Sequence, residues 1–129
     1  MLRKSLHVVF SLGIGIAMAG PQAAQAQEPR SFQASPEIYK VIAENEQYRI
    51  IEATWKPGQR DAWHSHGKMV GTYNLSSPGC SFRLHTRNGK FVERKSKAGM
   101  GRFSKGAASH SFENVGQTEC KTILFESKQ

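Results

Sequence analysis

Short stretches of alternating apolar and polar residues, separated by turn residues, make up most of the chain from residue 39 onward. Residues 39–43 and 48–55 flank a polar turn and predict a hairpin, which ends at Pro57-Gly58. Further strands are predicted near residues 62–66, over residues 69–75 and over residues 120–126. No long helical period interrupts them. About eight short strands predict an all-β sandwich or small barrel.

The clearest hairpin spans residues 80–95 and turns at Asn88-Gly89. In its first strand Phe82, Leu84 and Thr86 alternate with polar residues, as expected for a half-buried strand. Asn-Gly is typical of a type I′ turn, in which both central residues have positive φ.

The N-terminus predicts a cleaved signal peptide over residues 1–26. A basic start is followed by an apolar run at residues 8–19 and by Ala24-Gln25-Ala26, a small-x-small cleavage site. The run is shorter than the roughly 20 residues that a membrane span needs, and no other segment is apolar enough to span. We therefore expect a periplasmic or secreted protein.

After cleavage, residues 27–38 are polar, contain Pro29 and Pro36, and predict a flexible leader, followed by one domain at residues 39–128. Loss of Arg3 and Lys4 lowers the formal charge from +8 to +6. No nucleic-acid-binding motif accompanies this charge, and export argues against nucleic acid as a partner. The charge fits a basic, soluble surface, and an anionic small molecule remains an alternative.

Cys80 and Cys120 are the only two cysteines. An oxidising compartment favours a disulfide between them over two buried thiols.

Three of the five histidines form the main candidate site. His64 and His66 are two residues apart, so on a strand they share one face. His110, on a distant strand, would complete a three-imidazole site for a divalent transition metal: Zn, Fe, Cu or Ni.

These positions also resemble the motifs of the cupins, small double-stranded β-helix (jelly-roll) barrels. Gly58, His64 and His66 match the spacing of the first cupin motif. Gly99, His110 and Asn114 match that of the second, although Lys105 and Ala107 stand where Pro and Gly are usual. The chain is most similar to small, single-domain, exported bacterial cupins. The resemblance implies a jelly-roll barrel, and a homodimer paired through barrel edges.

One departure concerns the fourth ligand that the resemblance implies, a Glu at position 70 or 71, where this chain has Val70 and Gly71. Three histidines still leave an open coordination position for water or a ligand. The alternative is a barrel that has lost its metal.

Other residues near the motif have less defined roles. Tyr73 and Trp63 are candidates for lining the pocket, although packing is the more common role of a Trp. His85 lies between two arginines and is expected to be exposed. Neither Glu52 nor Glu113 is predicted to face inward as a general base.

Two functions remain at this stage. The favoured one is an exported cupin that binds a divalent metal and holds a small ligand, because short loops and few catalytic groups argue against turnover. The alternative is a metal-dependent cupin enzyme, dioxygenase- or isomerase-like, acting on a small organic substrate. The sequence leaves open whether the protein is an enzyme.

Overall fold

The computed structural model describes residues 27–128, which form one short helix and eight strands. In chain order the elements are α1 (Ser31–Ala34), β1 (Tyr39–Glu44), β2 (Tyr48–Trp55), β3 (Met69–Asn74), β4 (Gly79–His85), β5 (Phe91–Lys97), β6 (Gly101–Lys105), β7 (Ser111–Asn114) and β8 (Cys120–Ser127). The predicted signal peptide, residues 1–26, lies outside the described residues. Within the described part no helix is long and apolar enough to cross a membrane.

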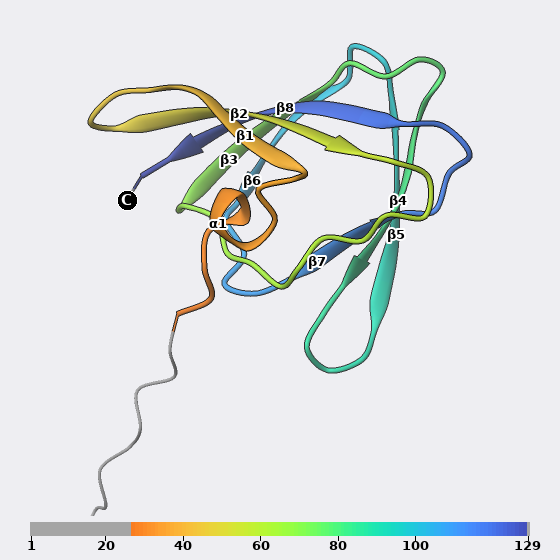
Figure 1. The fold of residues 1–129 in the computed structure, drawn as a ribbon, viewed down its shortest axis with the longest axis horizontal. Coiled ribbons are helices and arrows are strands. Elements are labelled where there is room, and N and C mark those ends of the chain that lie inside the picture. The colour runs from red at the N-terminus through yellow and green to blue at the C-terminus, as the bar shows by residue number, and fades with distance from the viewer. Residues whose placement is uncertain (1–26, 129) are drawn as a thin grey trace, which may run out of the picture.

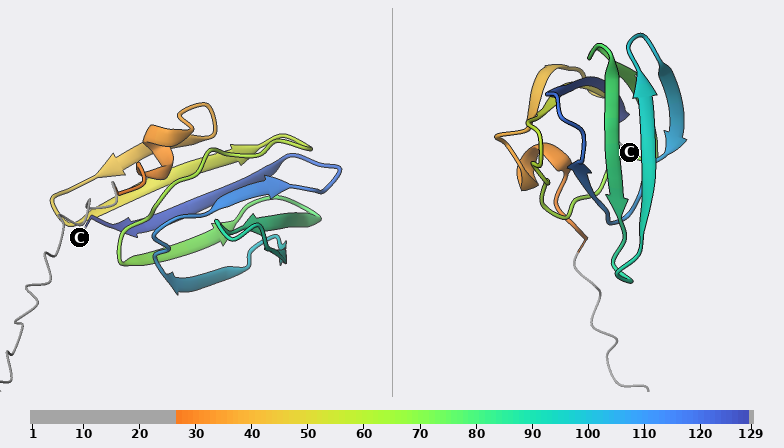
Figure 2. Two further views of the ribbon diagram at one scale, coloured as in Figure 1. Left: turned by 90° about the horizontal axis from the view of Figure 1, so that it is seen from below. Right: turned by 90° about the vertical axis from the view of Figure 1, so that its right-hand side faces the viewer.

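The strands form two antiparallel sheets that face each other across the core (Figure 1). One sheet has five strands in the order β1-β2-β8-β3-β6, and the other has three in the order β5-β4-β7. Figure 2 shows the five-stranded sheet and the hairpin of β4 and β5 in two further orientations. The two sheets and the single short helix confirm the predicted all-β fold class.

The core lies between the sheets and is built mainly from the inward-facing residues of β2, β3, β4 and β8. Ile51, Ala53 and Trp55 alternate along β2, and Leu124 of β8 packs beside them. The period of two that predicts the strands therefore also selects the core residues.

A disulfide links the two sheets. Cys80 on β4 is bonded to Cys120 on β8, and their Cα atoms are 5.7 Å apart. Both residues are buried among the core side chains. The pairing favoured from the sequence is thus present in the structure.

The turn between β4 and β5 differs from the predicted type I′. Only glycines have positive φ among the described residues, and Gly89 has φ +79°. Gly89 N–H donates to the Thr86 carbonyl, and Thr86 N–H donates to the Lys90 carbonyl. This is the pattern of a type I turn closed by a glycine bulge, in which only Gly89 needs the left-handed conformation.

The segment predicted as a flexible leader, residues 27–38, packs against the barrel. Ser31, Ser35 and Ile38 are all buried. Ser65 N–H donates to the Pro29 carbonyl, and Ala62 N–H donates to Ser35 Oγ. Polar composition suggested a free segment, but Ser35 Oγ and the Pro29 carbonyl accept hydrogen bonds from the backbone of the loop that carries the histidines.

Candidate metal centre

The histidine motif lies in the extended segment between β2 and β3. The sequence predicts a strand here, but the structure does not form one. The segment is held by isolated bridges, of which one joins His64 to His110 just before β7. His64 N–H donates to the His110 carbonyl at 3.0 Å, and His110 N–H donates back at 3.1 Å. The backbone itself therefore brings the two distant motifs together.

The three imidazoles converge on one point. His64, His66 and His110 each offer a ring nitrogen, and these atoms all lie within 4.8 Å of one another. The Nε2 atoms of His64 and His66 are 3.2 Å apart. Two nitrogens bound to one tetrahedral zinc ion would be about 3.3 Å apart, from Zn–N bonds of about 2.0–2.1 Å. The spacing of this pair fits a shared metal ion.

Hydrogen bonds fix the orientation of two of the rings. His64 Nδ1 lies 2.8 Å from the Ala62 carbonyl and His66 Nδ1 lies 2.9 Å from Glu126 Oε2. Since both partners are acceptors, each Nδ1 carries the proton and donates. In the neutral rings both Nε2 lone pairs then face each other, and a bound cation would remove their repulsion.

His110 supplies the third ring nitrogen, and its surroundings disfavour the protonated form. Its Nδ1 atom is buried without a hydrogen-bond partner in the described structure. Burial, followed by the charges of His64 and His66, lowers the pKa of His110 to about 3. Burial also lowers the pKa of His64, against the opposing effect of Asp61. Neutral imidazole is the form that binds metal, so His64 and His110 are ready as ligands at neutral pH.

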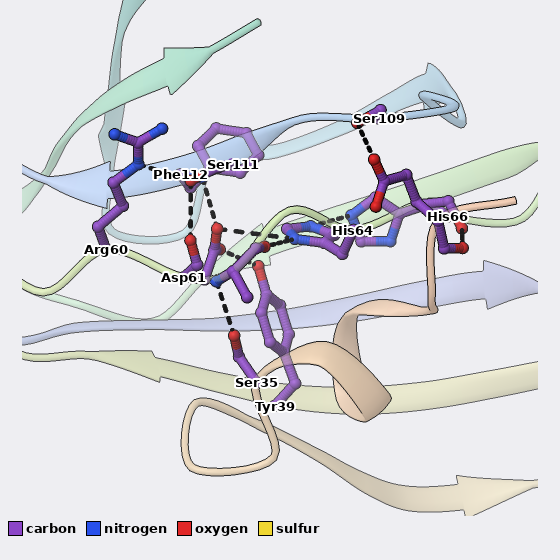
Figure 3. Close-up of polar contacts among 12 residues, drawn as sticks. Ser35, Tyr39, Arg60, Asp61, His64, His66, Ser109, Ser111 and Phe112 are labelled. Carbon is purple, nitrogen blue, oxygen red and sulfur yellow. Dashed lines mark hydrogen bonds and ion pairs between the residues drawn. The ribbon is translucent and has the colours of Figure 1, made fainter. Parts of the chain in front are cut away.

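A buried carboxylate, that of Asp61, lies beside Nδ1 of His64. Asp61 Oδ1 lies 3.6 Å from His64 Nδ1, and Asp61 Oδ2 accepts from the Tyr39 hydroxyl at 2.6 Å and from Trp55 Nε1 at 3.2 Å. Asp61 Oδ1 also accepts from Phe112 N–H at 2.7 Å. Figure 3 shows Asp61 beside His64, together with Tyr39 and Phe112. The arrangement restricts the segment from Asp61 to His64 to one position.

Burial raises the pKa of Asp61, whereas the charge of His64 and the hydrogen bond from Tyr39 oppose this rise. Burial, followed by the charge of Asp61, raises the pKa of Tyr39 well above its usual value. Tyr39 is therefore a fixed hydrogen-bond donor and is not poised to give up its proton.

Glu126, a residue that the sequence analysis did not single out, supports His66. It is 0% exposed and lies on β8 directly opposite Val70 of β3, where the resemblance implied a carboxylate. Glu126 Oε1 lies 3.8 Å from Arg49 Nη1 and has no hydrogen bond. A signal was present in the sequence, because Glu126 follows Leu124 with the inward-facing period of two.

A cavity of about 300 Å³ opens inside the barrel and reaches the histidines. His66 and His110 line it together with apolar side chains that include Trp55, Phe82 and Phe112. A metal ion held by the three imidazoles would therefore face this space with its open position.

The remaining candidate residues lie outside the cavity. Tyr73 is on the outer face of β3 and 49% exposed, and its neighbours Thr72 and Asn74 line the cavity instead. Trp63 also does not line it, and its ring is covered by the guanidinium groups of Arg60 and Arg87.

His85 and the two other glutamates considered above neither belong to the cluster of three histidines nor line the cavity. His85 is partly buried rather than exposed, and its Nε2 is 2.8 Å from Glu113 Oε2. Glu52 pairs with Lys121 at 3.6 Å. Neither carboxylate is available as a general base at the site.

Solved structures show which fold this is. A cupin domain from Bordetella pertussis matches with a TM-score of 0.64 at 21% identity, over 80% of this chain and 98% of that one. A double-stranded β-helix protein from Klebsiella pneumoniae matches with a TM-score of 0.54 at 20% identity, over 82% and 81%. A cupin protein from Desulfovibrio desulfuricans matches with a TM-score of 0.52 at 13% identity, over 91% and 97%.

The chain therefore has the cupin double-stranded β-helix fold. This confirms the fold that the spacing of His64, His66 and His110 suggested. No protein-family model and no curated protein sequence matches the chain. Because a fold hosts many activities, the function has to be argued from the site.

Proposed function

We propose that this protein is an exported cupin that binds one divalent transition metal ion through His64, His66 and His110 and holds a small anionic ligand in the barrel. The observation that carries the proposal is the convergence of the three ring nitrogens within 4.8 Å of one another. Two of the rings are held by hydrogen bonds through Nδ1, which leaves Nε2 for the metal.

The donor set restricts the choice of metal. Three neutral imidazoles without a coordinating carboxylate favour Zn, Fe, Cu or Ni over the harder ions Mn and Mg. A three-histidine shell keeps a coordination position for water or a ligand. Glu126 contributes as a hydrogen-bond partner of His66, because a carboxylate that hydrogen-bonds a coordinating His orients the ring and raises its basicity. Asp61 acts on His64 through its nearby charge, at 3.6 Å from Nδ1.

Export is part of this proposal. The predicted signal sequence and the Cys80–Cys120 disulfide are both compatible with an oxidising compartment such as the periplasm. The homodimer implied by the resemblance is also kept as a proposal, because large apolar side chains are exposed on the outer face of the five-stranded sheet.

A metal-dependent enzyme is the second candidate function. The observation that favours it is that the cavity reaches His66 and His110, so a bound molecule would lie beside the metal. A metal there would supply Lewis-acid chemistry or, for iron or copper, oxygen chemistry. However, no Asp or Glu lines the cavity, and a general base is therefore not evident. We favour the binding function for that reason.

Metal content of the export-processed protein tests the proposal. We expect about one ion per chain by mass spectrometry, and almost none in His64→Ala or His110→Ala. His85→Ala is the matched control, because His85 pairs with Glu113 away from the cluster. Metal retained in either of the first two variants would contradict the site, as would a wild-type protein that stays empty after reloading with Zn, Fe, Cu or Ni.

A further inference from the structure

Two arginines extend from the edge strands that flank the cavity. Arg94 of β5 is paired with Phe82 of β4, and Arg102 of β6 is paired with Thr72 of β3. Cross-strand partners share a face of the sheet, and Phe82 and Thr72 both line the cavity. Arg94 and Arg102 themselves line this cavity, one from each edge strand, and both residues are exposed to solvent.

Neither guanidinium forms an ion pair with another residue that the structure describes. Across residues 27–128, the arginines in ion pairs are Arg49, Arg83 and Arg87. The cavity lining also includes Lys95 and Lys105 and contains no Asp or Glu. Charges of one sign around a concave, low-dielectric site concentrate the potential there, so the cavity attracts anions.

The rest of the cavity wall is largely apolar. Trp55, Phe82 and Phe112 pack edge to face, with ring centroids 5.0 to 6.4 Å apart, and Leu84 and Leu124 also line the cavity. A bare inorganic anion would leave this surface uncovered. The volume, about 300 Å³, is at the lower end of the range for small-molecule pockets.

We propose that the ligand is a small organic oxyanion with an apolar body, bound through its carboxylate or phosphate group by Arg94 and Arg102. The planar guanidinium fork matches both oxyanions with paired N–H donors. The inference deepens the proposed function by specifying the ligand of the barrel cavity. It does not require the metal, because the two arginines belong to β5 and β6 and the histidines do not.

Calorimetric titration of the mature protein with size-matched acids and amides tests the inference. The probes are phenylacetate and phenylacetamide, hexanoate and hexanamide, with phenyl phosphate to compare the two oxyanions. We expect each acid to bind about tenfold or more tightly than its amide, because charge-assisted hydrogen bonds are the stronger ones. The preference should weaken as salt concentration rises.

Two double variants test whether Arg94 and Arg102 cause the preference for acids over amides. Arg94→Gln with Arg102→Gln should abolish the preference for acids. Lys40→Gln with Lys90→Gln removes the same net charge from exposed positions away from the cavity and should keep it. Equal binding of acids and amides, no binding of any probe, or an equal loss in both double variants would overturn the inference.

Metal analysis of the same samples separates this inference from the proposed function. Metal-loaded wild-type protein without acid preference would overturn the inference alone. A His64→Ala protein that lacks metal and still prefers acids would support the inference independently of the metal. Wild-type protein that prefers acids and takes up no metal would contradict the metal site and leave the inference standing.

Discussion

At the scale of single residues, the nearest carboxylate to His66 comes from an unexpected strand. Glu126 of β8 lies opposite Val70, and its Oε2 atom is 2.9 Å from His66 Nδ1. Arg49 lies between Glu126 and Glu44, which is partly exposed at the surface. Lys128, followed by Arg49, lowers the pKa of Glu44, so Glu44 stays ionised and helps to hold Arg49 in place. Charges of alternating sign on Glu44, Arg49 and Glu126 thus connect the surface to His66.

Glu126→Gln tests the role of this carboxylate. We expect zinc affinity to fall by about 10- to 100-fold, because a neutral amide orients His66 but no longer raises the basicity of its ring. Competition with a chromophoric chelator measures the change. Glu52→Gln, which removes a carboxylate from the partly exposed pair with Lys121, is the control and should leave affinity unchanged. Unchanged affinity in Glu126→Gln would show that the carboxylate has no part in metal binding.

At the scale of elements, the Cys80–Cys120 disulfide joins β4 of the smaller sheet to β8 of the larger one. The sheets are also joined by apolar packing and by hydrogen bonds such as that from Asn114 Nδ2 of β7 to the Trp55 carbonyl of β2. The cross-link closes a segment of 40 residues, which restricts the unfolded chain substantially.

Replacing both cysteines by alanine should lower the free energy of unfolding by about 3–4 kcal/mol, from the loop-closure entropy of a segment of this length. Urea denaturation measures the difference. Reductant should destabilise the wild-type protein to a similar degree and should not affect the double variant. Two free thiols on unreduced, unfolded wild-type protein would disprove the bond.

At the scale of the whole molecule, the outer face of the five-stranded sheet is unusually apolar. Phe103 of β6 is 77% exposed, and Phe125 of β8 is 43% exposed. Both are paired with Gly71 of β3, which lies between them, and the Phe103 ring covers that glycine. Tyr48 stacks on Phe125 with ring centroids 4.9 Å apart. An exposed apolar surface of this kind is typical of an interface.

We therefore expect a homodimer that buries this face, detectable by sedimentation velocity at micromolar concentration. Phe103→Ser should shift the protein toward monomer, because it removes the most exposed aromatic side chain on the face. Phe91→Ser, at an exposed position on the other sheet, should leave the association unchanged. A wild-type protein that sediments as a monomer would refute this interface.

Much of the architecture and of the metal site follows from local sequence patterns. The period of two along residues 48–55 and 120–126 predicts strands and their inner faces, because a strand projects alternate residues to one side. The spacing of His64, His66 and His110 identifies the three residues whose ring nitrogens converge. The strand expected at residues 62–66 was wrong. A short stretch of extended backbone is enough to place both imidazoles on one side, so their spacing does not require a continuous strand.

What the sequence by itself determined is thus the class of fold and the three clustered histidines, since both depend on spacing along the chain. Only the tertiary structure decided which carboxylates support them and which residues line the cavity. Glu126 meets His66, and Arg94 and Arg102 flank one cavity, through strand pairing between distant segments. Tyr73 faces outward for the same reason: strand pairing and packing decide which face of β3 covers the core.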